Sequence, residues 1–390
     1  MDAAVVRGVR DLSERWARQM SGGSTVLSGL GVWPLLAILA TAADEPGRSE
    51  LADAAGLPAD VSADQAGRLV ETLGASTDLS AALGVWIRDD LKLAESFDRV
   101  VPAMMRGVLT GDARRDKAVL DGWAAEHTDG LIPEMPLEVT PDLVLALASA
   151  LSLKTTWVKA FEEHPRHVHE GPWAGAWQWL SRSDPDLSTV RLYDDTPARV
   201  LVTATVAGDA DVDVVLGLGE PGAPARVVVP ALLEVDGNGI DGGTLLERNE
   251  SGTELTPGLS VGTTSARKPD VRVSLPVFEV RAEHDLLAHA ELFGLGSVSR
   301  PPGATGHFSG ISPEPLRVSQ AKQTVYARFF ATGFEAAAVT AVGMVRMAMM
   351  TEPSKRLELE LDRPFAFVAV HRASGLPIVA GWIAEPTQPA

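Results

Sequence analysis

The sequence predicts a single α+β domain in which helices come first along the chain and antiparallel strands follow. Two observations lead to this fold class. In the N-terminal third of the 390 residues, apolar side chains recur at helical spacing, whereas the chain after about residue 186 consists of short Val-rich runs between Gly, Pro and Asp. No repeat, low-complexity linker or composition break separates the two regions, so we expect residues 1–390 to form one domain.

In the N-terminal third, apolar residues recur every three or four positions. Five of them predict an amphipathic helix at the start of the chain: Val5, Val9, Leu12, Trp16 and Met20. The same spacing predicts four further helices: Leu35–Ala43, Ser49–Ala55, Ala63–Leu73 and Ala113–His127. The nearly continuous apolar run Leu143–Leu153 predicts a buried strand.

Beyond these helices, short runs rich in β-branched residues predict antiparallel strands. The runs are Arg199–Val206, Val212–Leu216, Arg226–Val229 and Val271–Val280. A helix is expected over Leu286–Leu295, and two later strands over Leu316–Phe330 and Arg356–Ala369.

Composition and charge narrow the possible functions. Hydrophobic residues make up 45% of the chain and charged residues 22%, as in ordinary globular proteins. The absence of cysteine excludes disulfides, thiol catalysis and Cys-based zinc sites. A formal net charge of −18 repels phosphate backbones and anionic membranes, so we expect no nucleic-acid or membrane partner.

The N-terminal stretch MDAAVVRGVRDLSERWARQM carries charges throughout and lacks an apolar core of signal-peptide length. The longest apolar stretch, Val32–Ala43, is too short to span a bilayer. A cytoplasmic location is therefore expected.

A glycine pattern typical of dinucleotide-binding loops follows one of the predicted strands. Gly217, Gly219 and Gly222 spell GxGxxG. Such a loop must lead into a helix whose N-terminus faces the pyrophosphate. Pro224 and the strand-like run Val227–Val229 follow instead, so we expect a hairpin turn here.

Two other patterns have catalytic or ligand-binding residue types. Ser265 and Lys268 match SxxK, but their Gly- and Pro-containing surroundings predict a turn rather than the helical turn that this pair needs. A polar stretch could ligate a metal, although a solvated loop is the preferred interpretation: Glu163, His164, His167, His169 and Glu170. No HExxH motif occurs, and we expect no enzyme, metal or cofactor.

The segment Ala336–Met350 reads AAAVTAVGMVRMAMM, with Arg346 as its one charge. Ala and Met favour a buried helix, but Thr340, Gly343 and three valines interrupt it. In a strand, one face would be uncharged and mostly small: Phe334, Ala336, Ala338, Thr340, Val342 and Met344. Such a strand could enter between two existing strands at little steric cost. The residues alone leave buried helix and buried strand equally favoured.

The sequence on both sides of this segment resembles the serpin family in order and spacing. VSQAKQTVYARFFATGFEAAAVTAV (Val318–Val342) resembles the strand and hinge before the family's reactive loop, and LDRPFAFVAVHRASGLPIVAGWIAEPTQ resembles its C-terminal signature. LPVFEV, HFSGIS and WAAEHTDGLIPEM are also similar to serpin segments. Lys154, Trp157 and Phe161 match a strand whose tryptophan lies where loop insertion begins.

The resemblance implies a fold of three mainly antiparallel β-sheets with eight or nine helices and an exposed reactive-centre loop at about residues 333–356. It implies a monomeric suicide-substrate inhibitor that traps a serine protease as an acyl-enzyme when the cleaved loop inserts into the main sheet. The alternative is a non-inhibitory serpin-fold protein that is cleaved as a substrate or acts by binding, and an enzyme on this fold is a remote third.

The resemblance also assigns residues to this mechanism. The hinge comprises Gly333, Phe334, Glu335, Ala336, Ala337, Ala338 and Thr340. The family's spacing places the attacked bond at Met347–Ala348, which suits proteases of subtilisin, elastase or chymotrypsin type. Arg346 is the alternative and would suit a trypsin-like protease.

Three hinge and sheet positions depart from the family pattern. Ser149 and Gln323 stand where Asn and His usually form a hydrogen bond across the central strands, in a sheet-opening region that also includes Trp157. Phe334 stands where a small residue is usual. We expect Phe334 to be overpacked by about 1–3 kcal/mol as it enters the sheet, which would slow insertion.

Overall fold

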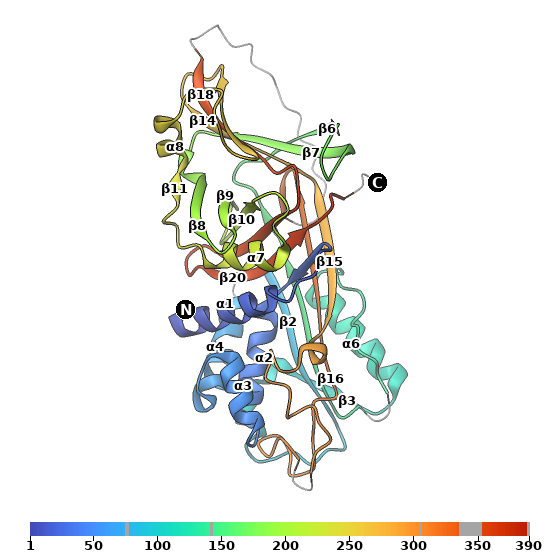
Figure 1. The fold of residues 1–390 in the computed structure, drawn as a ribbon. Coiled ribbons are helices and arrows are strands. Elements are labelled where there is room, and N and C mark those ends of the chain that lie inside the picture. Colours follow the sequence, from blue (N-terminus) through green and yellow to red (C-terminus); the bar gives the residue numbers. More distant parts are fainter. Residues whose placement is uncertain (75–77, 141–142, 304–305, 335–352, 388–390) are drawn as a thin grey trace.

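Three β-sheets, with helices packed against them, make up the computed structural model (Figure 1). It describes residues 1–74, 78–140, 143–303, 306–334 and 353–387. Most strand pairs are antiparallel, and the described residues contain eight α-helices. An α+β fold with three mainly antiparallel sheets is thereby confirmed.

The main sheet runs along the long axis of the molecule in Figure 1. It has the strand order β3 (Arg106–Leu109), β2 (Leu79–Arg88), β4 (Leu145–Leu153), β16 (Gln320–Phe330) and β15 (Phe278–Asp285). Two short strands, β17 (Gly333–Phe334) and β5 (Thr155–Thr156), extend it at the end where β16 finishes. The central strands β4 and β16 are parallel, and this pair is the one that a new strand would have to separate.

The other two sheets lie beyond this end of the main sheet. The second has the order β1 (Thr25–Leu27), β20 (Leu376–Ile383), β19 (Phe365–His371), β10 (Val212–Gly219), β9 (Arg199–Ala207), β8 (Val190–Thr196) and β11 (Ile240–Asp241). The third has the order β12 (Glu254–Thr256), β13 (Leu259–Thr264), β18 (Ser354–Glu360), β14 (Asp270–Pro276), β7 (Gly175–Asp184) and β6 (Glu162–Val168).

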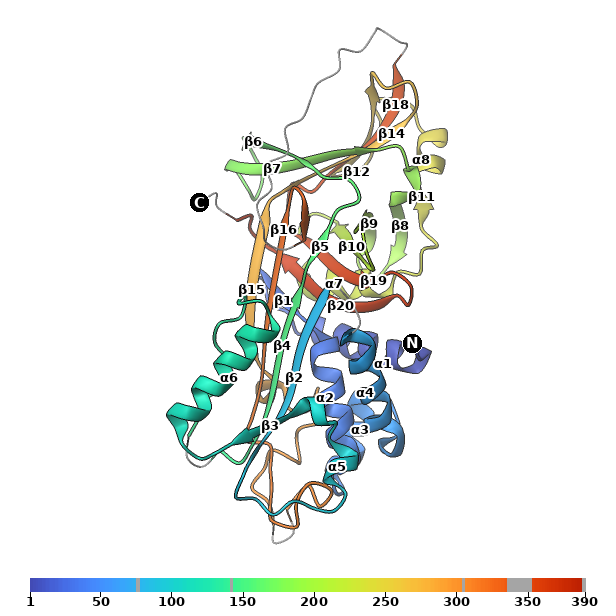
Figure 2. The same cartoon turned by 180° about the vertical axis from the view of Figure 1, so that it is seen from behind.

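Helices cover both faces of the main sheet. On one side lie α1 (Ala3–Ala17), α2 (Gly29–Ala42), α3 (Gly47–Ala55) and α4 (Ala59–Gly74), and on the other lies α6 (Ala113–His127), as Figures 1 and 2 show. The remaining helices are α5 (Phe97–Val100), α7 (Ala225–Glu234) and α8 (Gly242–Arg248). No helix in the described ranges is long and apolar enough to cross a bilayer.

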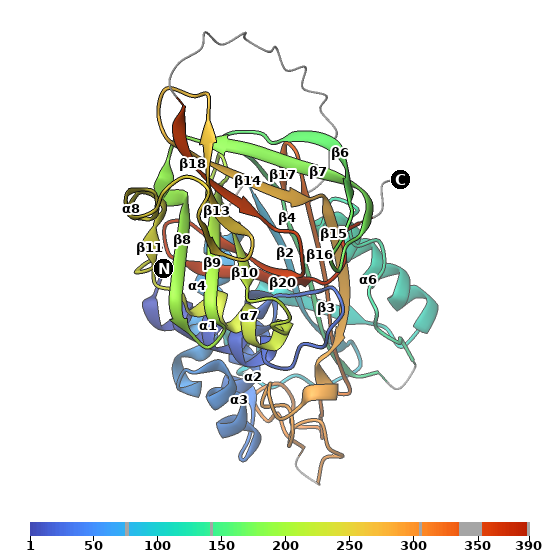
Figure 3. The ribbon, with the colours of Figure 1, turned by 45° about the horizontal axis from the view of Figure 1, so that its top comes forward.

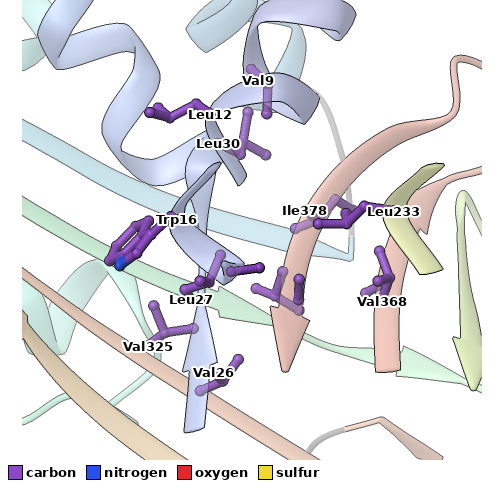
Figure 4. Packing of buried hydrophobic residues seen from close by; sticks show 14 of the residues in the cluster. Val9, Leu12, Trp16, Val26, Leu27, Leu30, Leu233, Val325, Val368 and Ile378 are labelled. Atoms are coloured by element: carbon purple, nitrogen blue, oxygen red, sulfur yellow. The ribbon is translucent and has the colours of Figure 1, made fainter. Parts of the chain in front are cut away.

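The core lies where α1 and α2 meet two of the sheets. Side chains of α1, α2, β1 and α7 converge there with Val325 of β16, Val368 of β19 and Ile378 of β20 (Figure 4). Helix α2 is apolar almost all round because nearly every one of its residues is buried. Its N-terminus is capped by the Ser28 hydroxyl, which accepts a hydrogen bond from the Gly31 N–H at 3.0 Å.

One predicted strand is wrong. Residues 226–229 belong to α7, not to a strand, although three consecutive valines favour strands. Pro224 immediately precedes the helix, and burial of Val228 and Leu232 against β10 outweighs the weak helix propensity.

The predicted helix Leu286–Leu295 is only partly present. A 3₁₀ turn covers Leu286–His289, and the chain then turns away. Gly294 adopts a positive φ of 65° and approaches the Glu50 backbone so closely that a Cβ would overlap it. A continuous helix cannot include that conformation.

Candidate functional site

The short strand β17 lies between two strands of the main sheet. Gly333 and Phe334 pair antiparallel with the last two residues of β16 on one side and with β5 on the other. These two residues begin the hinge identified in the sequence. The first part of the hinge is therefore already a strand of the main sheet in this conformation.

Phe334 fills a closed aromatic pocket in the core. Its side chain is 1% exposed, and its ring centroid lies 6.0 Å from that of Phe367, 6.4 Å from Phe329 and 6.5 Å from Trp157. These separations and the inclined ring planes are favourable for aromatic pairs. The overpacking expected from the sequence is not seen, because the pocket accommodates the ring before any further insertion.

Gly333 is required by close backbone packing. A Cβ at this position would overlap the carbonyl oxygen of Thr155 and lie 3.3 Å from the Thr156 Cα. Three hydrogen bonds hold the turn before it: Trp157 N–H to the Thr332 carbonyl (3.0 Å), Phe161 N–H to the Ala331 carbonyl (2.7 Å) and Trp157 Nε1–H to the Phe330 carbonyl (3.0 Å). The tryptophan singled out in the sequence thus fixes the start of the hinge.

Below β17, strands β4 and β16 close against each other. They pair directly over six positions, from Gln320 opposite Ala146 to Val325 opposite Leu151. We call this paired stretch of β4 and β16 the seam. Gln323 and Ser149 face each other in the middle of it. Any strand that grew from β17 would have to part them.

Gln323 is bonded to the N-terminal cap of α2 rather than to Ser149. Its Oε1 accepts the Ser28 N–H at 3.1 Å, and its Nε2 donates to the Ser28 carbonyl at 2.9 Å. The Ser28 hydroxyl donates to the carbonyl of Ile378 in the second sheet at 2.6 Å. The contact joins β16, α2 and the second sheet in one buried polar cluster.

Ser149 is fully buried, and its Oγ has no hydrogen-bond partner among the described residues. An unpartnered buried hydroxyl costs about 1–3 kcal/mol. The neighbouring backbone of Gly31 leaves little room, because a Cβ there would lie 2.7 Å from the Ser149 Oγ. The seam therefore contains a polar atom that a further strand could satisfy.

Residues Ser354–Glu360 form β18, a central strand of the third sheet (Figure 3). β18 pairs with β13 over six positions and with β14 over five. Arg356 makes two hydrogen bonds to the Asp270 carboxylate, at 2.7 and 2.6 Å. The stretch between β17 and β18 thus has both ends fixed in sheets.

The rest of the sequence-derived site lies outside the described residues. This holds for Glu335, Ala336, Ala337, Ala338 and Thr340 of the hinge, and for Arg346, Met347 and Ala348 at the reactive bond. The choice between helix and strand for Ala336–Met350 also lies there.

A family model described as serpin (serine protease inhibitor) matches residues 9–172 and 249–386, which is more than half of the chain. The chain belongs to the serpin family. Plasminogen activator inhibitor 1 of Bos taurus is 25% identical over 321 residues, covering 79% of this serpin and 72% of the relative.

Solved structures share the fold of this serpin. Serpin48 of the insect Tenebrio molitor superposes with a TM-score of 0.72 at 14% identity, covering 98% of both chains. A thyroxine-binding globulin in complex with thyroxine superposes with a TM-score of 0.69 at 15% identity, covering 99% of both chains.

The GxGxxG glycines of this serpin serve helix packing. The expected hairpin turn is wrong, because the strand β10 does lead into a helix, α7. Gly217 and Gly219, however, lie within β10, where a Cβ would come to 2.8 Å from Leu232 and 2.7 Å from Val228 of α7. Only Gly222 lies in the connecting loop, so the three glycines do not form one phosphate-binding turn.

The polar stretch around His164 forms most of β6, an edge strand, instead of the expected loop. His167 and His169 lie on one face with ring centroids 4.9 Å apart. Within the described residues, no three His, Asp or Glu side chains gather closely enough to hold a metal ion. Ser265 and Lys268 lie in the turn between β13 and β14, as expected.

Sequence reasoning missed Ser28 as the partner of Gln323, and Thr155 and Phe367 as neighbours of the hinge. Ser28 and Gln323 are 295 positions apart in the chain. No local pattern links residues so far apart.

Proposed function

We propose that this serpin is a suicide-substrate inhibitor of serine proteases. The protease's serine Oγ attacks the carbonyl carbon of Met347, the amide bond to Ala348 breaks, and the protease's own base delivers a proton to the leaving amine. The freed loop then extends β17 between β4 and β16 before water can hydrolyse the acyl-enzyme. An apolar-specific protease of subtilisin, elastase or chymotrypsin type is the proposed target, with a trypsin-like protease if Arg346 is attacked.

The pairing of β17 on both sides is the observation that carries this proposal. It supplies a nucleus from which a longer strand can grow, and its register can be continued along the sequence. Phe334 faces the core, so the uncharged set of alternate residues that includes Ala336, Ala338 and Thr340 would face the core as well.

Continuing this register brings Thr340 to the polar cluster in the seam. Six residues beyond Phe334, the antiparallel pairing puts Thr340 opposite Gln323 on one side and Ser149 on the other. Its hydroxyl could supply the missing partner of the Ser149 Oγ. The existing bonds between β4 and β16 would be replaced by two ladders, a net gain of one ladder, on the order of 10 kcal/mol at about 1 kcal/mol for each bond.

The seam also favours a second candidate, a serpin that is cleaved without trapping its protease. Gln323 is tied to Ser28, and β4 and β16 are paired over six positions. If this seam opens more slowly than the acyl-enzyme hydrolyses, the loop behaves as a substrate. A barrier difference of about 1.4 kcal/mol changes the ratio of the two rates tenfold.

One experiment separates the two functions. The serpin is mixed with subtilisin, elastase, chymotrypsin and trypsin, and the products are resolved on denaturing gels while the released C-terminal fragment is sequenced. An SDS-stable complex and a fragment that begins at Ala348 are expected. Clean cleavage by every protease, with no complex, would contradict inhibition for this panel. A thermal midpoint that does not rise after cleavage would contradict insertion itself.

A further inference from the structure

The strands β17 and β18 hold the two ends of residues 335–352 in sheets, and we call them the N-terminal and C-terminal anchors. A basic pocket lies beside both anchors. It has a volume of about 400 Å³, and nine residues line it: Lys159, Ser183, Asp184, Pro185, Ala266, Arg267, Lys268, Pro269 and Asp270. Three cations stand at its surface in a protein whose formal net charge is −18. The charge at this pocket is therefore opposite in sign to that of the protein as a whole.

The acids of the pocket are neutralised by arginines. Asp184 lies 3.8 Å from the guanidinium of Arg182, whose side chain is 5% exposed. Asp270 accepts both hydrogen bonds from Arg356. The negative charges are therefore compensated within the protein and do not offset the surface cations.

The surface cations themselves remain uncompensated. Lys159, Arg267 and Lys268 are exposed and form no ion pair among the described residues. Lys159 Nζ donates to the backbone carbonyl of Ser183, which brings it against the end of β7. A pocket with neutralised acids and free cations attracts negative charge.

The position of the pocket indicates which partner meets it. Lys159 comes three residues after Thr156, the partner of Gly333 in β5. Arg267 and Lys268 lie in the turn between β13 and β14, the two strands that hold the start of β18. A protein that binds residues between β17 and β18 would thus meet these cations next to both anchors.

We propose that Lys159, Arg267 and Lys268 form a secondary docking surface for an acidic patch next to the active site of the target protease. The inference rests on the proposed function and names a feature of its partner. The cations would raise the rate of encounter and select acidic proteases, while the loop sequence selects the bond. Of the SxxK match, Ser265 would then have no role, and Lys268 would act only through its positive charge.

The test compares two triple charge reversals of equal net charge. One carries Lys159→Glu, Arg267→Glu and Lys268→Glu, and the control carries Lys92→Glu, Arg114→Glu and Arg115→Glu at exposed positions far from the anchors. The second-order rate of loop cleavage is measured at low and high salt with an acidic and a basic chymotrypsin-type protease. With the acidic enzyme, the first variant should be slower by at least about tenfold at low salt, and salt should reduce the difference.

A small probe reads the same surface without any protease. Fluorescent hexaglutamate should bind the wild type and the control at low salt, and binding should be lost in the variant of Lys159, Arg267 and Lys268. Equal cleavage rates for both variants with the acidic enzyme, or equal hexaglutamate binding, would overturn the docking surface. Loop cleavage without an SDS-stable complex would instead overturn inhibition and leave both measurements of docking intact.

Discussion

The two ends of residues 335–352 are held in different ways. At the N-terminal end, β17 contributes two residues, which pair on both sides at the point where β4 and β16 part. At the C-terminal end, β18 contributes seven residues, with both edges paired and an arginine–carboxylate pair across to β14. In the proposed mechanism the first anchor lengthens between β4 and β16, whereas β18 is paired on both edges and has no room to move.

Under the proposed function, this difference gives cleavage a physical role. A strand that grows from β17 draws chain into the main sheet at about 3.3 Å per residue, away from β18. In the intact protein β18 must therefore either stop that growth or leave its sheet. Cutting the chain between the anchors removes the tether without disturbing either one.

Removing the aromatic ring of the N-terminal anchor should have the largest effect. Phe334→Ala empties a closed pocket, and we expect a loss of about 3–5 kcal/mol in stability. The urea midpoint and the thermal midpoint at a fixed scan rate would measure it. Phe330→Ala, at a half-buried position of the adjoining strand, is the control and should lose less. Equal losses would mean that Phe334 is not an anchor.

The second-largest loss of stability should follow when the ion pair between Asp270 and Arg356 in the C-terminal anchor is broken. Asp270→Ala leaves Arg356 mostly buried without its carboxylate, at a cost of about 3 kcal/mol. Limited proteolysis should then release β18 before the main sheet unfolds. The double variant Asp270→Leu with Arg356→Leu removes both charges and should recover most of the loss. A double variant as unstable as Asp270→Ala would show that packing, rather than charge, is at stake.

The seam between the anchors can be loosened separately. Gln323→Leu leaves the N–H and carbonyl of Ser28 without partners, and we expect a loss of about 1–3 kcal/mol. Because the seam opens more easily, a larger share of the cleaved serpin should form a complex with the protease. Gln320→Leu on the same strand is the control, since water can replace its exposed contacts. An unchanged ratio of complex to cleaved product would place the barrier elsewhere.

At the same place in the seam, Ser149→Ala should have the opposite effect and raise the stability of the protein. Removing the unpartnered hydroxyl should stabilise the uncleaved protein by about 1 kcal/mol. The rise in thermal midpoint on cleavage should then be smaller than in the wild type, because Thr340 has lost its proposed partner. A larger rise, or the same change in a Thr340→Val background, would contradict the proposed register.

Lowering the pH should cause the smallest loss of stability, and it should act on the main sheet, which contains the N-terminal anchor. Burial lowers the pKa of His284 on β15 below its ordinary 6.5, and its Nε2 donates to the Val26 carbonyl at 2.8 Å. The unfolded chain takes up the proton first, because its histidine pKa is the higher of the two. The free energy of unfolding therefore keeps its full value above about pH 6.5 and decreases as the pH falls below it. Thermal midpoints below pH 6.5 should fall less for His284→Gln than for the wild type. An equal fall in the two proteins would contradict this role of His284.

Local pattern predicted much of the secondary structure. The helix Ala113–His127 has the bounds read from the sequence, and the apolar run Leu143–Leu153 is the buried strand β4 apart from its first two residues. Both have strong periodicity or continuous apolar character, so local preference and burial agree. In residues 226–229 they disagree, and packing of α7 on the glycines of β10 decided for the helix.

The sequence by itself determined that residues around Gly333 resemble a serpin hinge and that one face of the following segment carries no charge. Only the tertiary structure decided that Phe334 is already inside the sheet and that Gln323 is bonded to Ser28. The reason is physical: a residue's own preference for burial or hydrogen bonding is local, whereas its pocket or partner is assembled from elements hundreds of positions away. The Phe334 pocket joins residues from Trp157 to Phe367, and no short-range rule can place them together.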